Sequence, residues 1–383
     1  MAAQWTDERS AAGKRNPWLI VGVISLATFM EVLDTSIANV SLTHSAGGLS
    51  ATVDQATWVL TSYLVANAII IPISGWLSDV IGRKRYYMIS VALFAFSSLC
   101  CGLAPSLGLL ITARLFQGVR GGGLAPSEQS FLADTCPPQK RGQAFAAYGV
   151  VVVCGPVLGP TLGGWITDNL SWHWIFLINV PVGILSLVLV HSFVCEPPVL
   201  EKERRERLKH GLKVDYFGFA LVAVGLGCLE ITLDRGERLD WFSSALITTT
   251  AIVAVVSIAL LIVWELSRKD PIVDLRLMRN RNFALCFVFM TTTGIVLFGT
   301  TQLIPQMLQQ VLGYSATDAG LALTTGGLAT LVAMPIVGQL AGRVDTRLLI
   351  IPALLLQAVA MWRMSHFDSG ISFGDASQAR LLS

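Results

Sequence analysis

Long apolar stretches, separated by short polar segments, run along almost the whole chain. When the sequence is divided at its charge clusters, Gly/Pro turns and polar runs, each stretch has about the 20 residues that a helix needs to cross a membrane. The first stretch is not a cleavable signal peptide, because it is too long and no small-residue cleavage site follows it. We predict eleven membrane-spanning helices, at about residues 18–42, 56–78, 86–104, 107–134, 142–165, 172–195, 215–234, 243–265, 283–304, 317–341 and 346–366.

Composition excludes a soluble protein. Hydrophobic residues make up 53% of the 383 residues and charged residues only 14%, whereas charged residues are about 25% of an ordinary soluble domain. A water-soluble fold cannot cover so much apolar surface with so few charges, and disorder requires the opposite bias. The sequence therefore indicates an all-α polytopic membrane protein.

The seven cysteines form no Cys-x-x-Cys pair, and most of them lie within or at the ends of apolar stretches. We interpret them as small apolar residues rather than as a disulfide or metal framework. The five histidines are scattered without the spacing of metal ligands.

Basic residues occupy alternate loops, which predicts the orientation of the spans. The opposite loops hold only Arg235 and Arg238. Because cytoplasmic loops carry the excess of Lys and Arg, the N-terminus is predicted to be cytoplasmic, and the unbroken alternation supports the number of spans. The basic loops contain Arg9, Lys14 and Arg15; Arg83, Lys84 and Arg85; Lys140 and Arg141; Lys202, Arg204, Arg205, Arg207, Lys209 and Lys213; Arg268, Lys269, Arg276, Arg279 and Arg281; and Arg343 and Arg347.

The loop between the second and third spans carries a compact motif of Gly75, Asp79, Gly82, Arg83 and Lys84. The turn is very short, so a glycine at its centre supplies the backbone freedom that the reversal needs. The aspartate can pair with the adjacent cations or with a neighbouring helix end. The alternative is a generic charged loop without a specific role.

The fourth span contains Arg114, Gln117 and Gly118, with Glu128 further along the same predicted helix. An arginine inside an apolar helix is costly and normally faces the interior of the bundle with a partner. The alternative is that Arg114 extends to the outer interface, because it lies only about two turns into the helix.

The fifth span has a glycine at every fourth position, which produces a stripe almost without side chains. Such a stripe lets another helix approach closely, and prolines in the same stretch are expected to bend the helix. Ordinary tight packing is the simplest interpretation of this pattern. The stretch contains Gly155, Pro156, Gly159, Pro160, Gly163 and Gly164.

Two acids, Glu31 and Asp34, lie three residues apart in the first span and share roughly one helix face. Two ionised carboxylates near the middle of a membrane would repel each other and be poorly solvated, so at least one is expected to exchange protons near neutral pH. The alternative is a static pair with Arg114 or Arg120. Glu230 in the seventh span is a further intramembrane acid.

Together these motifs resemble those of the major facilitator superfamily, and within it the fourteen-helix family of drug/proton antiporters. The Gly75–Arg85 loop resembles its cytoplasmic-loop signature, and the Arg114 motif resembles the fourth-helix motif in which the arginine is associated with proton coupling. The glycine stripe resembles the antiporter motif, which uptake members generally lack. The segment around Asp34 resembles the first-helix motif, except that Thr43 stands where that motif usually ends in proline. The loop that follows Glu230 also resembles this family, although Glu230 replaces a neutral residue of its pattern.

The resemblance implies a domain organisation in which two extra helices separate two six-helix halves built from inverted repeats. The charged linker is expected either to be solvated or to form a surface helix on anionic lipid. Three helices fewer than fourteen are predicted, so we expect the chain to end about where a twelfth span would begin. The expected parts are a tail (1–17), a six-helix bundle (18–195), a linker (196–214), a two-helix insert (215–265), a loop (266–282) and the first three helices of a second bundle (283–383).

The resemblance implies a proton-coupled antiporter that exports hydrophobic drugs and toxic compounds across the bacterial inner membrane. It needs no cofactor other than the proton gradient, and its expected partners are a periplasmic adaptor and an outer-membrane channel. Three alternatives remain: an exporter of a single metabolite or siderophore, an inactive transporter fragment, and a membrane-embedded enzyme or sensor. The sequence disfavours the last, because it contains no nucleophile elbow, P-loop or His-Glu-x-x-His motif.

Overall fold

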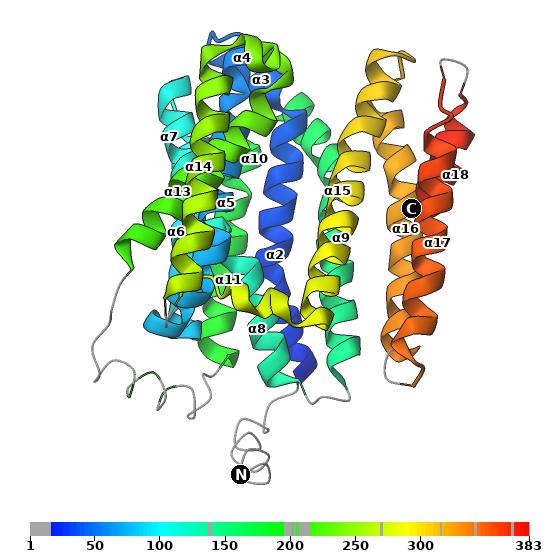
Figure 1. Cartoon of the computed structure of the whole chain (residues 1–383). Helices are drawn as coiled ribbons and strands as arrows, with labels where there is room; N and C mark the ends of the chain where they lie inside the picture. The colour runs from blue at the N-terminus through cyan, green and yellow to red at the C-terminus, as the bar shows by residue number, and fades with distance from the viewer. Residues whose placement is uncertain are drawn as a thin grey trace. The chain divides into compact units, whose positions relative to one another are not determined.

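The computed structural model describes residues 17–136, 140–194, 201, 204, 206, 215–268, 271–314, 316–340, 343–368 and 371–382. These residues are almost entirely helical, and no strand occurs among them (Figure 1). The predicted all-α fold is therefore confirmed.

Each predicted span coincides with one helix or with two consecutive short helices. The first span begins with Pro17, which suits the first turn of a helix because proline has no N–H to leave unpaired there. The spans form α2 (Pro17–Val40), α5 (Trp58–Ile81), α6 (Arg83–Gly102), α7 (Leu107–Gly121) with α8 (Leu124–Thr135), α9 (Arg141–Asn169), α10 (Trp174–Leu177) with α11 (Asn179–Phe193), α13 (Tyr216–Arg235), α14 (Ala245–Ser267), α15 (Arg281–Gln310), α16 (Ala316–Leu340) and α17 (Thr346–Met364).

Within the described residues, nine helices are long and apolar enough to cross a membrane, and the bent helix α9 adds a tenth. The predicted span 107–134 is absent from that group because it is divided between α7 and α8. The interruption falls at Gly122 and Gly123, where Asn67 of α5 and the phenol of Tyr86 approach so closely that neither glycine has space for a Cβ atom.

Short elements complete the connections. The helices α3 (Leu42–Gly48) and α4 (Val53–Ala56) follow α2, and the 3-10 turns η2 (Glu237–Leu239) and η3 (Trp241–Ser243) join α13 to α14. A third 3-10 turn, η4 (Leu275–Arg279), precedes α15, and α18 (Phe373–Leu382) ends the described chain.

The chain divides into two compact units. The first contains the described residues up to Ala27 together with Leu42–Phe131 and Phe176–Ala284. In it, α5 packs on α7 and α13, α6 packs on α7 and α11, and α13 lies along α14, as the labelled ribbons show (Figure 1).

The second unit contains Thr28–Ser41, Leu132–Ile175 and the residues from Leu285 onward. In it, α9 packs on α16, and α18 packs on α16 and α17. A small core joins Ile304 and Leu308 of α15 to Ala322 of α16 and Ala376 of α18. Helix α2 belongs to both units, because the division falls after Ala27.

A buried carboxylate holds the start of α13 to the end of α14. Asp215 caps α13 by accepting the N–H of Gly218 at 2.9 Å, and it also accepts the indole N–H of Trp264 at 2.9 Å. Nε of Arg268 lies 3.1 Å from the same carboxylate. Burial alone would raise the pKa of Asp215, but the Gly218 amide, the Trp264 indole and the Arg268 guanidinium together hold that pKa below its usual value.

This contact predicts a pH-dependent contribution to stability. The carboxylate stabilises the fold above its unfolded pKa of 3.8, and the contribution is lost as the pH falls through the lower pKa of the folded state. Replacement of Asp215 by Asn should therefore lower the unfolding free energy by about 1–3 kcal/mol at neutral pH, and the difference from wild type should disappear in strong acid.

Thermal unfolding in detergent between neutral and strongly acid pH measures this difference. Asp240→Asn is the matched control, because Asp240 is exposed and its left-handed backbone suits asparagine. A difference between wild type and Asp215→Asn that persisted at low pH would contradict the assignment.

Candidate functional site

The two acids of the first span are buried in the described fold. Asp34 is 2% exposed and Glu31 is 9% exposed, and both lie on the part of α2 that belongs to the second unit. The Thr35 hydroxyl next to Asp34 donates to the carbonyl oxygen of Glu31 at 3.0 Å. This segment of α2 therefore carries two carboxyl groups almost without contact with solvent.

The glycine stripe of α9 packs directly on that acidic segment of α2. Gly155 meets Val32 and Leu33, and Gly163 meets Ile37, so that a Cβ atom at either glycine would lie within 3 Å of an α2 side chain. Gly159 meets the Ser36 side chain still more closely. Gly164, by contrast, has nothing within 4 Å of a Cβ atom.

Proline bends α9 in the same region, as predicted. The helix changes direction by 40° between the segment that ends at Pro156 and the segment that begins at Thr161. Pro160 lies inside this bend. The Thr28 hydroxyl donates to the Tyr148 hydroxyl at 3.4 Å and adds a polar contact between α2 and α9.

Arg114 is completely buried in the first unit, at 0% exposure, so its side chain does not reach an outer interface. Its Nη1 donates to Oε1 of Gln117 at 2.8 Å, and its guanidinium carbon lies 4.5 Å from the ring centre of Tyr63. Gly118 allows this contact, because the backbone of Tyr63 and the side chain of Ala66 occupy the position of its missing Cβ. The motif thus holds the guanidinium cation of Arg114 between α5 and α7.

Glu128 on α8 faces α6 within the first unit and is 0% exposed. The hydroxyl of Tyr87 lies 3.3 Å from Oε1 of Glu128 and 2.9 Å from the carbonyl oxygen of Ile24 on α2. Glu230, the other intramembrane acid of the sequence, is half-buried on α13.

The loop motif forms the turn between α5 and α6. Gly82 has a φ of 97°, a conformation that L side chains rarely adopt, which confirms the need for glycine there. Lys84 donates to the carbonyl of His191 at the end of α11 at 3.0 Å, and Arg204 of the linker donates to the carbonyl of Ile81 at 3.1 Å. Asp79 is exposed, and Gly75 has open space around it. Arg83 is half-buried at the first position of α6.

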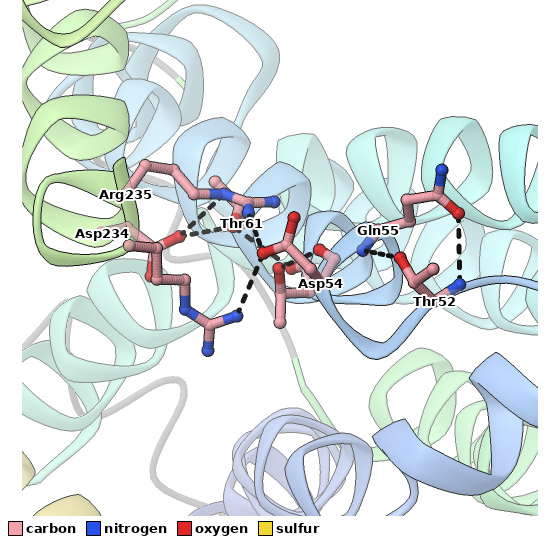
Figure 2. Close-up of polar contacts among 8 residues, drawn as sticks. Thr52, Asp54, Gln55, Thr61, Asp234 and Arg235 are labelled. Atoms are coloured by element: carbon pink, nitrogen blue, oxygen red, sulfur yellow. Dashed lines mark hydrogen bonds and ion pairs between the residues drawn. The ribbon is translucent and has the colours of Figure 1, made fainter. Parts of the chain in front are cut away.

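A polar cluster that the sequence did not predict joins the end of α13 to α4 and α5 (Figure 2). Arg235 is 3% exposed, its guanidinium lies 4.2 Å from the ring centre of Trp58, and its Nη1 lies 3.6 Å from the Asp54 carboxylate. Arg238 approaches the same carboxylate at 3.8 Å, and Asp234 accepts the Thr61 hydroxyl. The one available signal was that these two arginines are the only cations of the predicted outer loops.

Among the described residues there is neither a group of side chains that could bind a metal ion nor a disulfide bond. No group of three or more His, Cys, Asp or Glu side chains among them could hold a metal ion. No disulfide joins the six cysteines in the described part of the chain, two of which are buried. The cysteine Cys195 lies outside the described residues.

The fold and the buried polar groups define a multi-pass helical membrane protein. The sequence model of the Major Facilitator Superfamily matches residues 24–374. The chain therefore belongs to the Major Facilitator Superfamily and is a transporter rather than an enzyme.

Relatives support the same assignment over most of the chain. The multidrug export protein EmrB of Escherichia coli K12 is 44% identical over 360 residues, which are 94% of this chain and 69% of the relative. EmrB of Haemophilus influenzae is 41% identical over 95% of this chain and 70% of the relative. The fatty acid resistance protein FarB of Neisseria gonorrhoeae is 41% identical over 92% of this chain and 68% of the relative.

Solved structures show the same fold. The xylose transporter XylE from Escherichia coli, in a partially occluded inward-open conformation, aligns with a TM-score of 0.57 at 13% identity over 96% of this chain and 83% of that chain. A second structure of XylE, bound to a glucose analogue, aligns with a TM-score of 0.63 at 17% identity over 96% of this chain and 78% of that chain. At this identity the likeness concerns the fold.

The need for glycine in the stripe of α9 can be tested by adding a single methyl group, with a glycine-to-alanine substitution at each of two positions. Alanine is favoured over glycine in a helix by about 1 kcal/mol, so Gly164→Ala should stabilise the protein slightly. Gly159→Ala should destabilise it by about 1–3 kcal/mol, because the added methyl must displace Ser36. Thermal unfolding of the two variants in detergent measures the difference, and equal unfolding temperatures would show that α9 does not need a bare surface at this position.

The polar cluster gives a second test. Arg235→Ala should lower stability by about 2 kcal/mol, because it removes a desolvated cation from the Trp58 ring. Arg238→Ala is the matched control, because Arg238 is 50% exposed and exposed ion pairs contribute about 0–1 kcal/mol. The prediction fails if both variants unfold at the same temperature.

Proposed function

We propose that this chain is a proton-coupled antiporter that exports hydrophobic compounds across the bacterial inner membrane. The observation that carries the proposal is the contact between the glycine stripe of α9 and the α2 segment with Glu31 and Asp34. Carboxyl groups buried in a membrane protein are expected to bind and release protons, and a change in their charge must alter the forces on the helix that carries them.

The packing allows a movement of α2, caused by a change in the charge of its carboxyl groups, to be passed to neighbouring helices. Gly155, Gly159 and Gly163 leave no flexible side chains between the two helices to absorb a small movement of α2. Helix α9 in turn packs on α16, where Gly149 meets Met334 and Gly338 meets Ala146. In the proposed cycle, a proton on Asp34 or Glu31 shifts the balance between outward-facing and inward-facing arrangements.

The same proposal includes the topology and the partners. We propose a cytoplasmic N-terminus, and a six-helix bundle, a two-helix insert and a second set of helices with the boundaries predicted from the sequence. The exporter uses the proton gradient without another cofactor. It passes its substrate to a periplasmic adaptor and an outer-membrane channel.

The proposed substrates are hydrophobic or amphipathic molecules. Relatives are named for multidrug export, for fatty acid resistance and, in the 32% identical EmrB of Acinetobacter baumannii, for colistin resistance. A fatty acid has a long apolar chain, and export of several unlike compounds suits an adaptable apolar pocket. A panel of lipophilic dyes and fatty acids separates broad export from export of one class.

The proton assignment predicts that Asp34→Asn abolishes efflux driven by a pH gradient. Asparagine keeps the size of the side chain but cannot exchange a proton, so dye efflux from vesicles should fall to the level of vesicles without the protein. Dye binding should persist, because the fold is unchanged. The measurement is dye fluorescence after an imposed pH jump.

Asp240→Asn serves as the control, because it removes an equal charge from an exposed loop and should leave efflux intact. Full efflux by Asp34→Asn would exclude Asp34 as the coupling residue. Efflux that does not respond to the pH gradient in the wild-type protein would exclude proton antiport altogether.

A further inference from the structure

Glu128 is a second kind of buried acid, which the proposed cycle does not use. It lies on α8 in the first unit, whereas Glu31 and Asp34 lie on the part of α2 in the second unit. Its side chain has 0% exposure. An ionised carboxylate in such a place is costly, so its protonation state should respond strongly to its polar contacts.

The proposal concerns the contact between Glu128 and the hydroxyl of Tyr87. This hydroxyl has one hydrogen to donate, and two neighbouring oxygens can accept it. The carbonyl oxygen of Ile24 lies 2.9 Å from this hydroxyl, and Oε1 of Glu128 lies 3.3 Å from it. Tyr87 is 1% exposed, so water does not take the place of either acceptor in this conformation. Its hydrogen can satisfy only one of the two fully.

The two protonation states of Glu128 therefore require different arrangements. A hydroxyl that donates to an ionised carboxylate forms a short bond of about 2.5–2.7 Å. The 3.3 Å separation from Glu128 is much longer, while the 2.9 Å separation from Ile24 is an ordinary hydrogen bond. The geometry matches a protonated Glu128 and a Tyr87 hydroxyl that donates to α2.

We propose that Glu128 is a proton-binding residue whose state Tyr87 transmits to α2. When Glu128 is protonated, Tyr87 donates to Ile24. When Glu128 releases its proton to solvent, the carboxylate attracts the phenolic hydrogen, and Ile24 loses this donor. The inference rests on the proposed function, because it adds a second proton site to the same transport cycle.

Ile24 is well placed to receive this signal. It lies one turn before the point after Ala27 at which α2 passes from the first unit to the second. The next turns of the same helix carry Glu31 and Asp34. A hydrogen bond gained or lost at Ile24 therefore acts on the helix that bears the proposed coupling acids.

The titratable groups around this contact come from α6 and α7. Helix α6 contributes Tyr86 and Tyr87, and α7 contributes Arg120, whose charge acts on Tyr86. Helix α2 has no titratable side chain between Pro17 and Met30.

Two measurements on the purified full chain test the proposal without any substrate. Infrared difference spectra between acid and alkaline pH report the carbonyl stretch of a protonated carboxylic acid. Hydrogen exchange of the α2 peptide around Ile24, corrected for the intrinsic effect of pH on exchange, reports how readily this turn of the helix opens, which the bond from Tyr87 opposes. In the wild type, exchange in α2 should become about fivefold faster as Glu128 ionises, which is the factor expected for one buried hydrogen bond.

The variants separate the two steps. Glu128→Gln should lose one carboxylic acid band and keep slow exchange in α2 at every pH. Tyr87→Phe should keep the band and show fast exchange at every pH, because the link is broken but the acid remains. Glu230→Gln is the control: it should lose a different band and retain the pH response of α2.

The proposal is overturned if Glu128→Gln keeps the full set of carboxyl bands, or if its α2 exchange still responds to pH as in the wild type. It is also overturned if Tyr87→Phe responds like the wild type, a result that remains decisive if the Glu128 variant does not fold. These readouts do not depend on efflux. A protein that fails the vesicle assay but passes these tests would refute antiport while retaining the Glu128 site.

Discussion

The contact between α9 and α2 depends on the absence of side chains at three positions. Gly155, Gly159 and Gly163 allow the backbone of α9 to lie against Val32, Ser36 and Ile37, and no larger residue would fit. Between membrane helices there is little hydrophobic gain to be had, so close van der Waals contact is the main source of attraction. The segment of α2 that makes this contact also carries the buried Glu31 and Asp34.

The structure holds three buried ionisable side chains in different ways. The guanidinium of Arg114 is held by Gln117 and by the face of Tyr63. Asp215 accepts two N–H hydrogen bonds and forms an ion pair with Arg268. Glu128 has a contact with a phenol that a carbonyl already attracts. The first two arrangements stabilise the charged form of the side chain, whereas we propose that the third side chain changes its charge.

Sequence patterns predicted the features that lie within one helix. The spacing of Gly155, Gly159 and Gly163 predicted a bare stripe, and the short turn at Gly82 predicted an unusual backbone angle, because each depends only on neighbouring residues. The division of the span 107–134 was missed, since hydropathy does not register a backbone break. Contacts such as Tyr87 with Glu128, or Asp54 with Arg235, join residues far apart in the chain. No local pattern encodes such pairs, although the isolation of Arg235 and Arg238 among the loops was a visible signal.

The cluster around Asp54 also connects the turn between α13 and α14 to an earlier part of the chain. Arg235 and Arg238 are the two basic residues of the predicted outer loops, and both approach the same carboxylate. Asp234 lies beside them, with an oxygen 3.9 Å from Nε of Arg235. Two acids thus meet two cations, although Asp54 comes from α4 and the other three residues come from the end of α13 and the turn that follows it. The connection between α13 and α14 therefore cannot move away from α4 without separating these charges.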